Sequence, residues 1–578
     1  MKNLTIYIYI LCLLFLQYSY CTVTKQRGRL QQERLYENLQ IKALPQEYRY
    51  FVLLNFTSLY PPPPTEQQSC PLHYGLFPRS LGEILDKHSV QELHLSLTQS
   101  NWRYGVWGGG IPRTIGPVGA QLVAWLGKNK EYVSPGETTN QWRDLVHSLG
   151  GMMCSSLHEM KEINTVLPLY TFSPWGLLPK NTSLLQGTIP RETVCTNNLT
   201  PLVKMLPCPS KGLSQLLLPK SLFNNLYHSL SVHLYYTEEE GELAMRIELY
   251  FSLVFNTRKW ERKGFSISDL FGSGVTSLCP LVVREESRVR IDLSELKDPH
   301  LLQVKNNKFV FSSSPQRSTP FYKLLHNSTA VNPKFKWTSP QTEKNLFNTQ
   351  QILLINRYTY SNGLEDGQIC SEIKNLFNTS LMLSHLETVP WYFRVYTHTI
   401  KTRLITDTGQ ILTTDLQNHT RLYKLQLARD NAQPLMLEMI HALSPNTTLH
   451  ICTYFQRAVL HWNSYPPDAH HGFYVPPIVL RPVSFSRGIS HLLNLEDWTP
   501  LEYTELIYSR PLLISLATPD FSMPYNVLCL VCTAVGIGFA LIYRLSTQPV
   551  KIGLDTVDTG GEGIIMRIMK LFRKVRTD

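Results

Sequence analysis

Short runs of alternating apolar and polar residues recur along the chain and predict a protein built mainly of β-strands. Alternation with a period of two places successive side chains on opposite faces of a strand. Turn residues, including the prolines at 61–64, separate these runs, a pattern that favours a sandwich-like β architecture with a few helices. The clearest runs lie at 48–54, 92–98, 230–236, 247–255, 289–293, 309–312, 391–399 and 449–455.

Two segments show helical periodicity instead. The first covers residues 78–88 and the second covers 139–153, where Thr138 or Thr139 is the candidate N-cap. In the second segment, five large apolar side chains fall on one helix face: Trp142, Leu145, Val146, Leu149 and Met152.

Longer apolar runs lie near the two ends of the chain. Residues 1–21 carry Lys2 and an apolar core from Leu4 to Leu16, too short for a bilayer core of ~30 Å, and we interpret them as a secretory signal peptide. A retained N-terminal anchor is the alternative. Residues 523–543 contain no charged side chain and match the ~20 residues of a transmembrane helix.

The charges beyond the second run set the expected topology. Residues 544–578 hold more basic than acidic side chains, so the positive-inside rule places this tail in the cytosol and the bulk of the chain in the lumen. The end of the tail predicts either a basic amphipathic helix on the membrane surface or a solvated segment. The luminal part is divided into an N-terminal region, 22–220, and a C-terminal β-rich region, 221–522.

Composition narrows the function classes. The 578 residues are 43% hydrophobic and 17% charged, which excludes a disordered, collagen-like or coiled-coil protein. The net charge of +11 is spread thinly, so no nucleic-acid partner is expected. The usual hydrolase, phosphate-loop and dinucleotide motifs are missing from the sequence. His470 and His471 lack further ligands at metal-binding spacing, so neither a metal nor a cofactor is expected.

Glycosylation and disulfide chemistry fit a luminal protein. Sequons occur at Asn55, Asn181, Asn198, Asn327, Asn378, Asn418 and Asn446. Seven cysteines lie between the two apolar runs: Cys70, Cys154, Cys195, Cys208, Cys279, Cys370 and Cys452. Because this number is odd, at least one thiol is free or bonded to another chain.

Several segments together carry a specific resemblance over nearly the whole chain. In this order, with a signal peptide and one C-terminal span, the chain closely resembles the PIG-T family of GPI transamidase subunits. The segments are HYGLFPRSLGEIL (73–85), ELHLSLTQSNW (92–102), RETVCTNNLTP (191–201), LPCPSKGLS (206–214), TVPWYFRVYTHT (388–399), FQRAVLHW (455–462), HHGFYV (470–475) and TPDFSMPYNVLCL (518–530).

The resemblance implies a non-catalytic subunit in the endoplasmic reticulum membrane. GPI transamidase replaces the C-terminal signal of a preprotein with a GPI lipid, and the chemistry resides in a caspase-like subunit, PIG-K. A PIG-T-like chain stabilises that subunit, is disulfide-linked to it, positions substrates, and assembles with GPAA1-like, PIG-S and PIG-U subunits. Expected partners are therefore these subunits, the GPI lipid and the preprotein.

The resemblance also assigns site residues. RETVCTNNLTP matches the segment that bonds the catalytic subunit, which selects Cys195 for the interchain disulfide; a bridge within the chain to Cys208 is the alternative. Asp520, Ser522 and Asn526 lie where lumen and membrane meet, and their polar groups can bind the GPI glycan or its ammonium group. The loop carrying His470 is implied to contribute.

Other interpretations stay open at this stage. Asp520 or Ser522 can instead cap the helix that Pro524 opens, and Asn526 can bond a neighbouring helix. A single-pass receptor or adhesion ectodomain shares the topology and the sequons. An enzyme in its own right is the third reading, and a Cys–His hydrolase has no local signature here.

Overall fold

A computed structural model describes residues 33–547, apart from 45–48, 61–75, 110, 112, 128–134, 180, 240, 257–263, 293–296, 304–308, 313–320, 325–333, 340–352, 362, 364, 379, 414–419, 467, 487–505 and 521. The expected signal peptide and most of the tail lie outside the described residues. The chain divides into two compact units, Met1–Ala517 and Thr518–Asp578.

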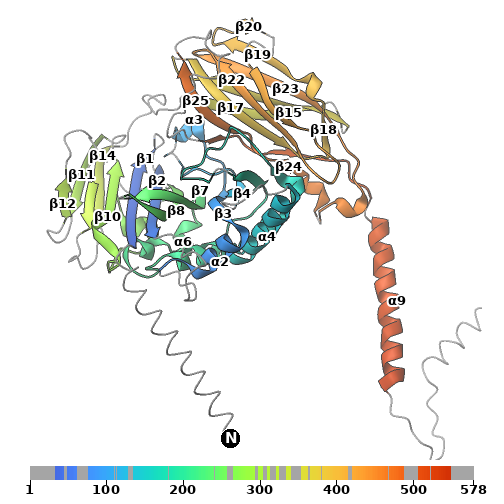
Figure 1. Ribbon diagram of the computed structural model, residues 1–578, viewed down its shortest axis with the longest axis horizontal. Coiled ribbons are helices and arrows are strands. Elements are labelled where there is room, and N and C mark those ends of the chain that lie inside the picture. The colour runs from blue at the N-terminus through green and yellow to red at the C-terminus, as the bar shows by residue number, and fades with distance from the viewer. Residues whose placement is uncertain are drawn as a thin grey trace, which may run out of the picture. The chain divides into compact units, whose positions relative to one another are not determined.

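The first unit is built on an eleven-stranded mixed sheet (Figure 1). Its only parallel pair among the described strands joins β1 to β10. In spatial order the strands are β12 (Phe309–Ser312), β13 (Phe321–Leu324), β10 (Val282–Asp292), β1 (Arg34–Ala43), β2 (Arg49–Tyr60), β8 (Glu242–Asn256), β7 (Tyr227–Glu239), β3 (Val90–Gln99), β4 (Gly119–Leu126), β6 (Ser183–Ile189) and β5 (Thr165–Val166).

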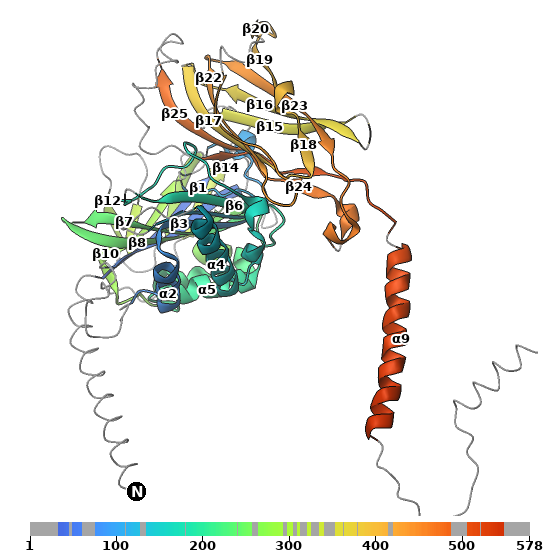
Figure 2. The same cartoon turned by 45° about the vertical axis from the view of Figure 1, so that its right-hand side comes forward.

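Alternation along these strands creates two different faces. In β3, the side chains of Leu93, Leu95 and Leu97 enter a core shared with helices on one face of the sheet, and His94 and Ser96 point to the other face. Figures 1 and 2 show α2 and α4 side by side over the first face. The helices of this layer are α2 (Arg79–His88), α4 (Pro135–Met153), α5 (Thr196–Met205), α6 (Pro219–Leu222) and α7 (Ile267–Phe271).

The later part of the first unit is a two-layer β sandwich, as the sequence predicts. One sheet contains β15 (Leu353–Tyr360), β16 (Asp366–Asn375), β18 (Phe393–Val395), β19 (Lys401–Thr406), β20 (Ile411–Thr413) and β23 (Thr447–Arg457). The other contains β17 (Ser380–Val389), β21 (Thr420–Gln426), β22 (Leu435–Leu443), β25 (Val479–Ser486) and β26 (Ile507–Tyr508). Leu381 and Leu449, from opposite layers, share one buried core.

That core continues into the eleven-stranded sheet. Phe51 of β2 and Trp107 of α3 (Tyr104–Trp107) are buried in the same cluster as the sandwich residues. Two smaller sheets complete the unit: one of β9 (Gly264–Ser266), β11 (Lys297–Gln303) and β14 (Lys334–Ser339), the other of β24 (Phe473–Val475) and β27 (Leu512–Ile514).

The predicted boundary between 22–220 and 221–522 does not separate two sheets. β7 and β8 follow that boundary, yet they pair with β3 and β2, which precede it. The strands up to β14 belong to the eleven-stranded sheet or to the small sheet of β9, β11 and β14, and the strands from β15 onward belong to other sheets. The predicted boundary falls inside the eleven-stranded sheet because hairpin β7–β8 lies at the centre of that sheet.

Two disulfides lie within the described part of the first unit. Cys208 bonds Cys279, and Cys370 bonds Cys452, its direct cross-strand neighbour on β16 and β23. The alternative bridge from Cys195 to Cys208 is therefore wrong.

The described part of the second unit consists chiefly of helix α9 (Ser522–Thr547). It has 26 residues, its most apolar 18-residue stretch has a mean hydropathy of 2.1 and none of its residues is buried, so it is long and apolar enough to cross a membrane. It contains the predicted span 523–543.

Candidate functional site

Cys195 lies immediately before the first residue of α5, and its thiol is free and exposed. Its backbone N–H donates to Oδ1 of Asn198 at 2.8 Å. The Asn198 amide nitrogen in turn donates to the carbonyls of Met153 and Cys154, both at 3.0 Å. Because Asn198 joins the start of α5 to the end of α4, Cys195 is presented to solvent on a fixed backbone.

The same contacts correct one glycosylation prediction. Asn198 is 1% exposed and both polar atoms of its amide are hydrogen-bonded inside the protein. A glycan must be attached to that amide nitrogen, so the sequon at Asn198 is not usable in this fold. Asn181, Asn378 and Asn446 are exposed, and Asn55 is partly exposed. Asn327 and Asn418 lie outside the described residues.

His470 and His471 are exposed on the short turn Ala469–His471, which precedes β24, and Ala469 of the same turn is buried. Gly472 follows it with a φ of 93°, in the left-handed region that favours glycine. β24 then pairs with β27, whose last residue, Ile514, is close to the end of the first unit. The turn is thus supported by the last strand before α9.

An ion pair places the segments of Cys195 and His470 side by side. Arg191 lies 3.7 Å from Asp468, and their side chains are 50% and 58% exposed. Such an exposed pair contributes at most about 1 kcal/mol, so it reports proximity more than it stabilises. The geometry joins two of the predicted sites on one surface of the first unit.

Asp520, Ser522 and Asn526 lie together in the second unit. The Asp520 carboxylate accepts a hydrogen bond from the N–H of Ser522, the first residue of α9, at 2.9 Å. Hydrogen bonds from the hydroxyl and the N–H of Ser522 lower the pKa of Asp520. Asp520 therefore caps α9, which is one of the two alternatives drawn from the sequence. Asn526 is exposed on the helix.

Sequence reasoning missed three residues that shape this surface: Arg191, Asp468 and Cys154. Cys154 is a second exposed free thiol, and its backbone carbonyl is bound by Asn198. Asn198 was noticed only as a sequon. Its position three residues after a cysteine at a helix start is the signal for a cap. Within the part of the chain that the structure describes, no cluster of His, Cys, Asp or Glu is placed to hold a metal ion.

The fold and the site define a disulfide-bonded β protein with one helix long and apolar enough to cross a membrane. The chain matches the family model described as the Gpi16 subunit, a GPI transamidase component, over residues 18–264 and 253–570. It belongs to this family.

Alignments with curated relatives cover most of this chain and most of each relative. A human protein named GPI-anchor transamidase component PIGT is 34% identical over 541 residues, 87% of this chain and 88% of the relative. Saccharomyces cerevisiae GPI transamidase component GPI16 is 26% identical over 559 residues, 87% and 86% of the two chains. A Schizosaccharomyces pombe PIG-T homolog is 25% identical, covering 93% and 94%.

Proposed function

We propose that this chain is a non-catalytic subunit of GPI transamidase that stabilises the caspase-like catalytic subunit and positions its substrates. The observation that carries the proposal is the exposed Cys195 thiol on a fixed helix start, in the segment that resembles the family's disulfide site. Family membership supports assembly with GPAA1-like, PIG-S-like and PIG-U-like subunits. A single-pass receptor or adhesion ectodomain would have no reason to contain the segment around Cys195.

The proposed location is the endoplasmic reticulum membrane, with α9 as the single span and the first unit in the lumen. Protease added to sealed microsomes should remove only the residues after Thr547, because the basic side chains beyond α9 favour the cytosol. Detergent should then expose the whole chain to the protease. Cleavage of the first unit in sealed microsomes, with the tail intact, would reverse the topology.

The GPI lipid is proposed to contact the start of α9, and His470 of the first unit is proposed separately as a substrate-binding residue. A GPI lipid has its glycan at the membrane surface, and the carboxylate, hydroxyl and amide groups of Asp520, Ser522 and Asn526 can bind sugar hydroxyls there. The cap made by Asp520 competes with this role. Substituting Asp520 in two ways separates the roles, because Asn keeps a capping oxygen but removes the negative charge.

The experiment tests the function directly. Asp520→Asn and Asn526→Ala should each lower GPI attachment to a reporter preprotein by about fivefold or more, the effect expected from the loss of one typical hydrogen bond of about 1 kcal/mol. Isolation in mild detergent should still recover the catalytic subunit at the wild-type ratio. Ser546→Ala, at the other end of α9, is the matched control, because its hydroxyl bonds only the backbone of Tyr543.

Two results would contradict the proposal. Asp520→Asn with wild-type attachment, beside Asp520→Ala with reduced assembly, would leave helix capping as the whole role of Asp520. Recovery of the wild-type chain without any peptidase-like partner would overturn the scaffold function itself.

A further inference from the structure

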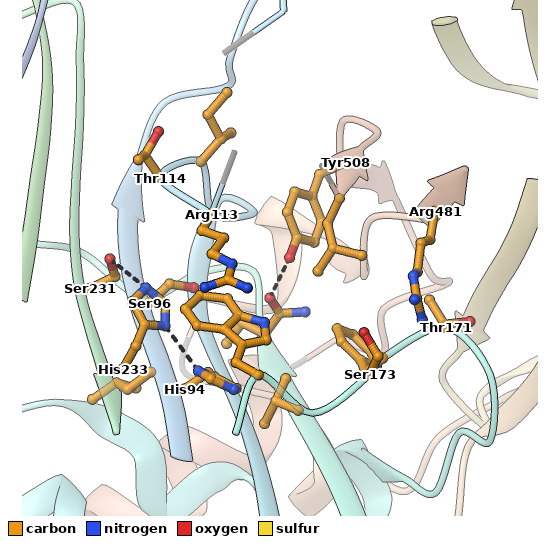
Figure 3. A pocket seen from close by; sticks show the side chains of 18 of the residues that line it. His94, Ser96, Arg113, Thr114, Thr171, Ser173, Ser231, His233, Arg481 and Tyr508 are labelled. Carbon is orange, nitrogen blue, oxygen red and sulfur yellow. Dashed lines mark hydrogen bonds between the residues drawn. The ribbon is translucent and has the colours of Figure 1, made fainter. Parts of the chain in front are cut away.

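A cavity of about 270 Å³ lies on the face of the eleven-stranded sheet that the helices do not cover. Strands β3, β4 and β7 supply one wall, and the segment Thr171–Trp175 supplies another (Figure 3). Arg481 of β25 and Tyr508 of β26 close it from the sandwich. Cys195 and His470 are not among its lining residues, so the cavity is distinct from the site described above.

The charges at the cavity wall have one sign. Arg113 and Arg481 both line it, and none of the described lining residues is Asp or Glu. The Arg113 guanidinium lies 4.2 Å from the centre of the Trp175 ring, a cation–π arrangement that fixes its position. Arg481 is 9% exposed and donates to the carbonyl of Tyr170 at 3.0 Å. A guanidinium stays charged in such a place, so the cavity favours an anion.

The histidines on the sheet form a chain of hydrogen bonds. Nε2 of His94 lies 2.7 Å from the Glu92 carboxylate and donates to it. Nδ1 of His94 and Nδ1 of His233 lie 3.1 Å apart, and Nε2 of His233 lies 3.0 Å from the Ser231 hydroxyl. Burial lowers the pKa of His233, which favours the neutral form of that ring.

One buried polar group at the wall is unused. Gln121 is 5% exposed, and its Oε1 accepts a hydrogen bond from the Tyr508 hydroxyl at 3.0 Å. Its amide nitrogen has no hydrogen-bond partner among the described residues. Buried polar groups are nearly always satisfied, so an unused amide facing a cavity indicates an acceptor supplied by a ligand.

The rest of the lining is apolar. Ile115, Val123, Phe172 and Leu506 all line the cavity. Its volume is slightly below the 300 Å³ or so at which pockets for drug-sized ligands begin. The ligand is therefore compact, with an apolar body and a polar head.

We propose that this cavity binds a compact organic anion. Its carboxylate or phosphate head interacts with Arg113 and Arg481 and accepts from the Gln121 amide, and its apolar body packs against Phe172 and Leu506. The His94–His233 chain and the Trp175 ring hold the wall in place before binding. The inference does not depend on the proposed role in GPI attachment.

Calorimetric titration of the detergent-solubilised complex containing the full chain tests the proposal. Phenyl phosphate and phenylacetate are the two anionic probes, and 2-phenylethanol is the neutral probe of similar shape. At least one anion should bind at least about tenfold more tightly than the alcohol, since bonds to charged groups are the stronger ones. The tighter of the two anions identifies the head group.

Variants locate the binding. Gln121→Leu should weaken anion binding about tenfold. Gln91→Leu is the control and should not change binding, because Gln91 lies on β3 of the same sheet but does not line the cavity. Arg481→Gln should weaken binding strongly, and Arg481→Lys should restore part of it by restoring the charge. Thermal unfolding without probe checks that each variant is folded. Equal binding of alcohol and anions, no binding of any probe, or unchanged affinity in folded Gln121→Leu would overturn the proposal.

Discussion

Replacing Glu438 by alanine should destabilise the first unit by about 3 kcal/mol or more. The Glu438 side chain on β22 is fully buried, and its carboxylate accepts three backbone N–H bonds, from residues 169, 170 and 171. It also accepts from the Thr171 hydroxyl; all four distances are 2.8 Å. Each buried donor left without an acceptor costs about 1–3 kcal/mol, so the loss of one carboxylate affects four groups together.

These contacts join two sheets, so their loss should destabilise the first unit as a whole. The segment from residue 169 to 176 lies between the sandwich and the eleven-stranded sheet, and Glu92 of β3 binds its other end through the N–H groups of Trp175 and Gly176. Two buried carboxylates from different sheets therefore hold one segment. Loss of Glu438 removes four of the hydrogen bonds that join the segment to the sandwich, and leaves the bond from Arg481 to the Tyr170 carbonyl and the attachment to β3.

Thermal unfolding and limited chymotrypsin digestion measure the change. Glu438→Ala should lower the unfolding midpoint by about 3 °C or more and create a new cleavage next to the exposed Leu169 and Tyr170. Asp430→Ala is the control, since its pair with Arg394 spans 3.5 Å at the surface and contributes below about 1 kcal/mol. A Glu438 variant as stable as this control would show that the segment is held by packing alone.

The local pattern predicts where many of the strands lie in the sequence. It does not predict which strands pair with each other. The run at 309–312 is strand β12 with the same limits, and 92–98 lies within β3. Alternation is a local property, whereas the pairing of β2 with β8 depends on residues far apart in the chain. Composition near residue 220 therefore suggested a boundary that the sheet crosses.

Element ends were predicted less well, for identifiable reasons. The helix expected from Thr139 begins at Pro135, where a proline needs no helical hydrogen bond from its nitrogen. The run at 391–399 forms only the short strand β18, because it pairs with β23 at three positions before the chain turns at Thr397–Thr399. A local proline accounts for the first end, and a tertiary partner accounts for the second.

In the candidate site, too, local features could be predicted from the sequence and tertiary contacts could not. Cys195 was found from its segment, but the surface around it was not, because Arg191 and Asp468 come from distant parts of the chain. The alternation at 92–98 predicted the strand itself, and in β3 it places His94 and Ser96 on the face opposite the leucines. Nothing local indicated that β4, β7 and the sandwich would close a cavity over that face.

Substituting Cys195 by serine should abolish the covalent link to the catalytic subunit. The Cys195 thiol is exposed, and the other described cysteines of the first unit, apart from Cys154, are paired in disulfides. The hydrogen bond from its N–H to Asn198 fixes the direction in which the thiol is presented. A disulfide needs two Cα atoms within about 7 Å, so a fixed backbone favours one partner geometry.

Non-reducing electrophoresis of the isolated complex measures the link. The wild-type chain should run as a heterodimer with the catalytic subunit and separate after reduction, whereas Cys195→Ser should give separate bands in both lanes. Cys154→Ser is the matched control, an exposed free thiol on the neighbouring helix end, and should keep the heterodimer. Asn198→Ala should reduce the yield of the heterodimer, because it frees the start of α5 while the thiol stays intact.

The serine variant should still attach GPI at a reduced rate. The disulfide raises the effective concentration of the partner without creating the non-covalent contacts, so those contacts should retain part of the complex in mild detergent. Washing at increasing detergent concentration should release the catalytic subunit from Cys195→Ser earlier than from Cys154→Ser. A heterodimer band that persists in Cys195→Ser, or that disappears only in Cys154→Ser, would assign the link to a different cysteine and remove the main support for the proposed scaffold surface.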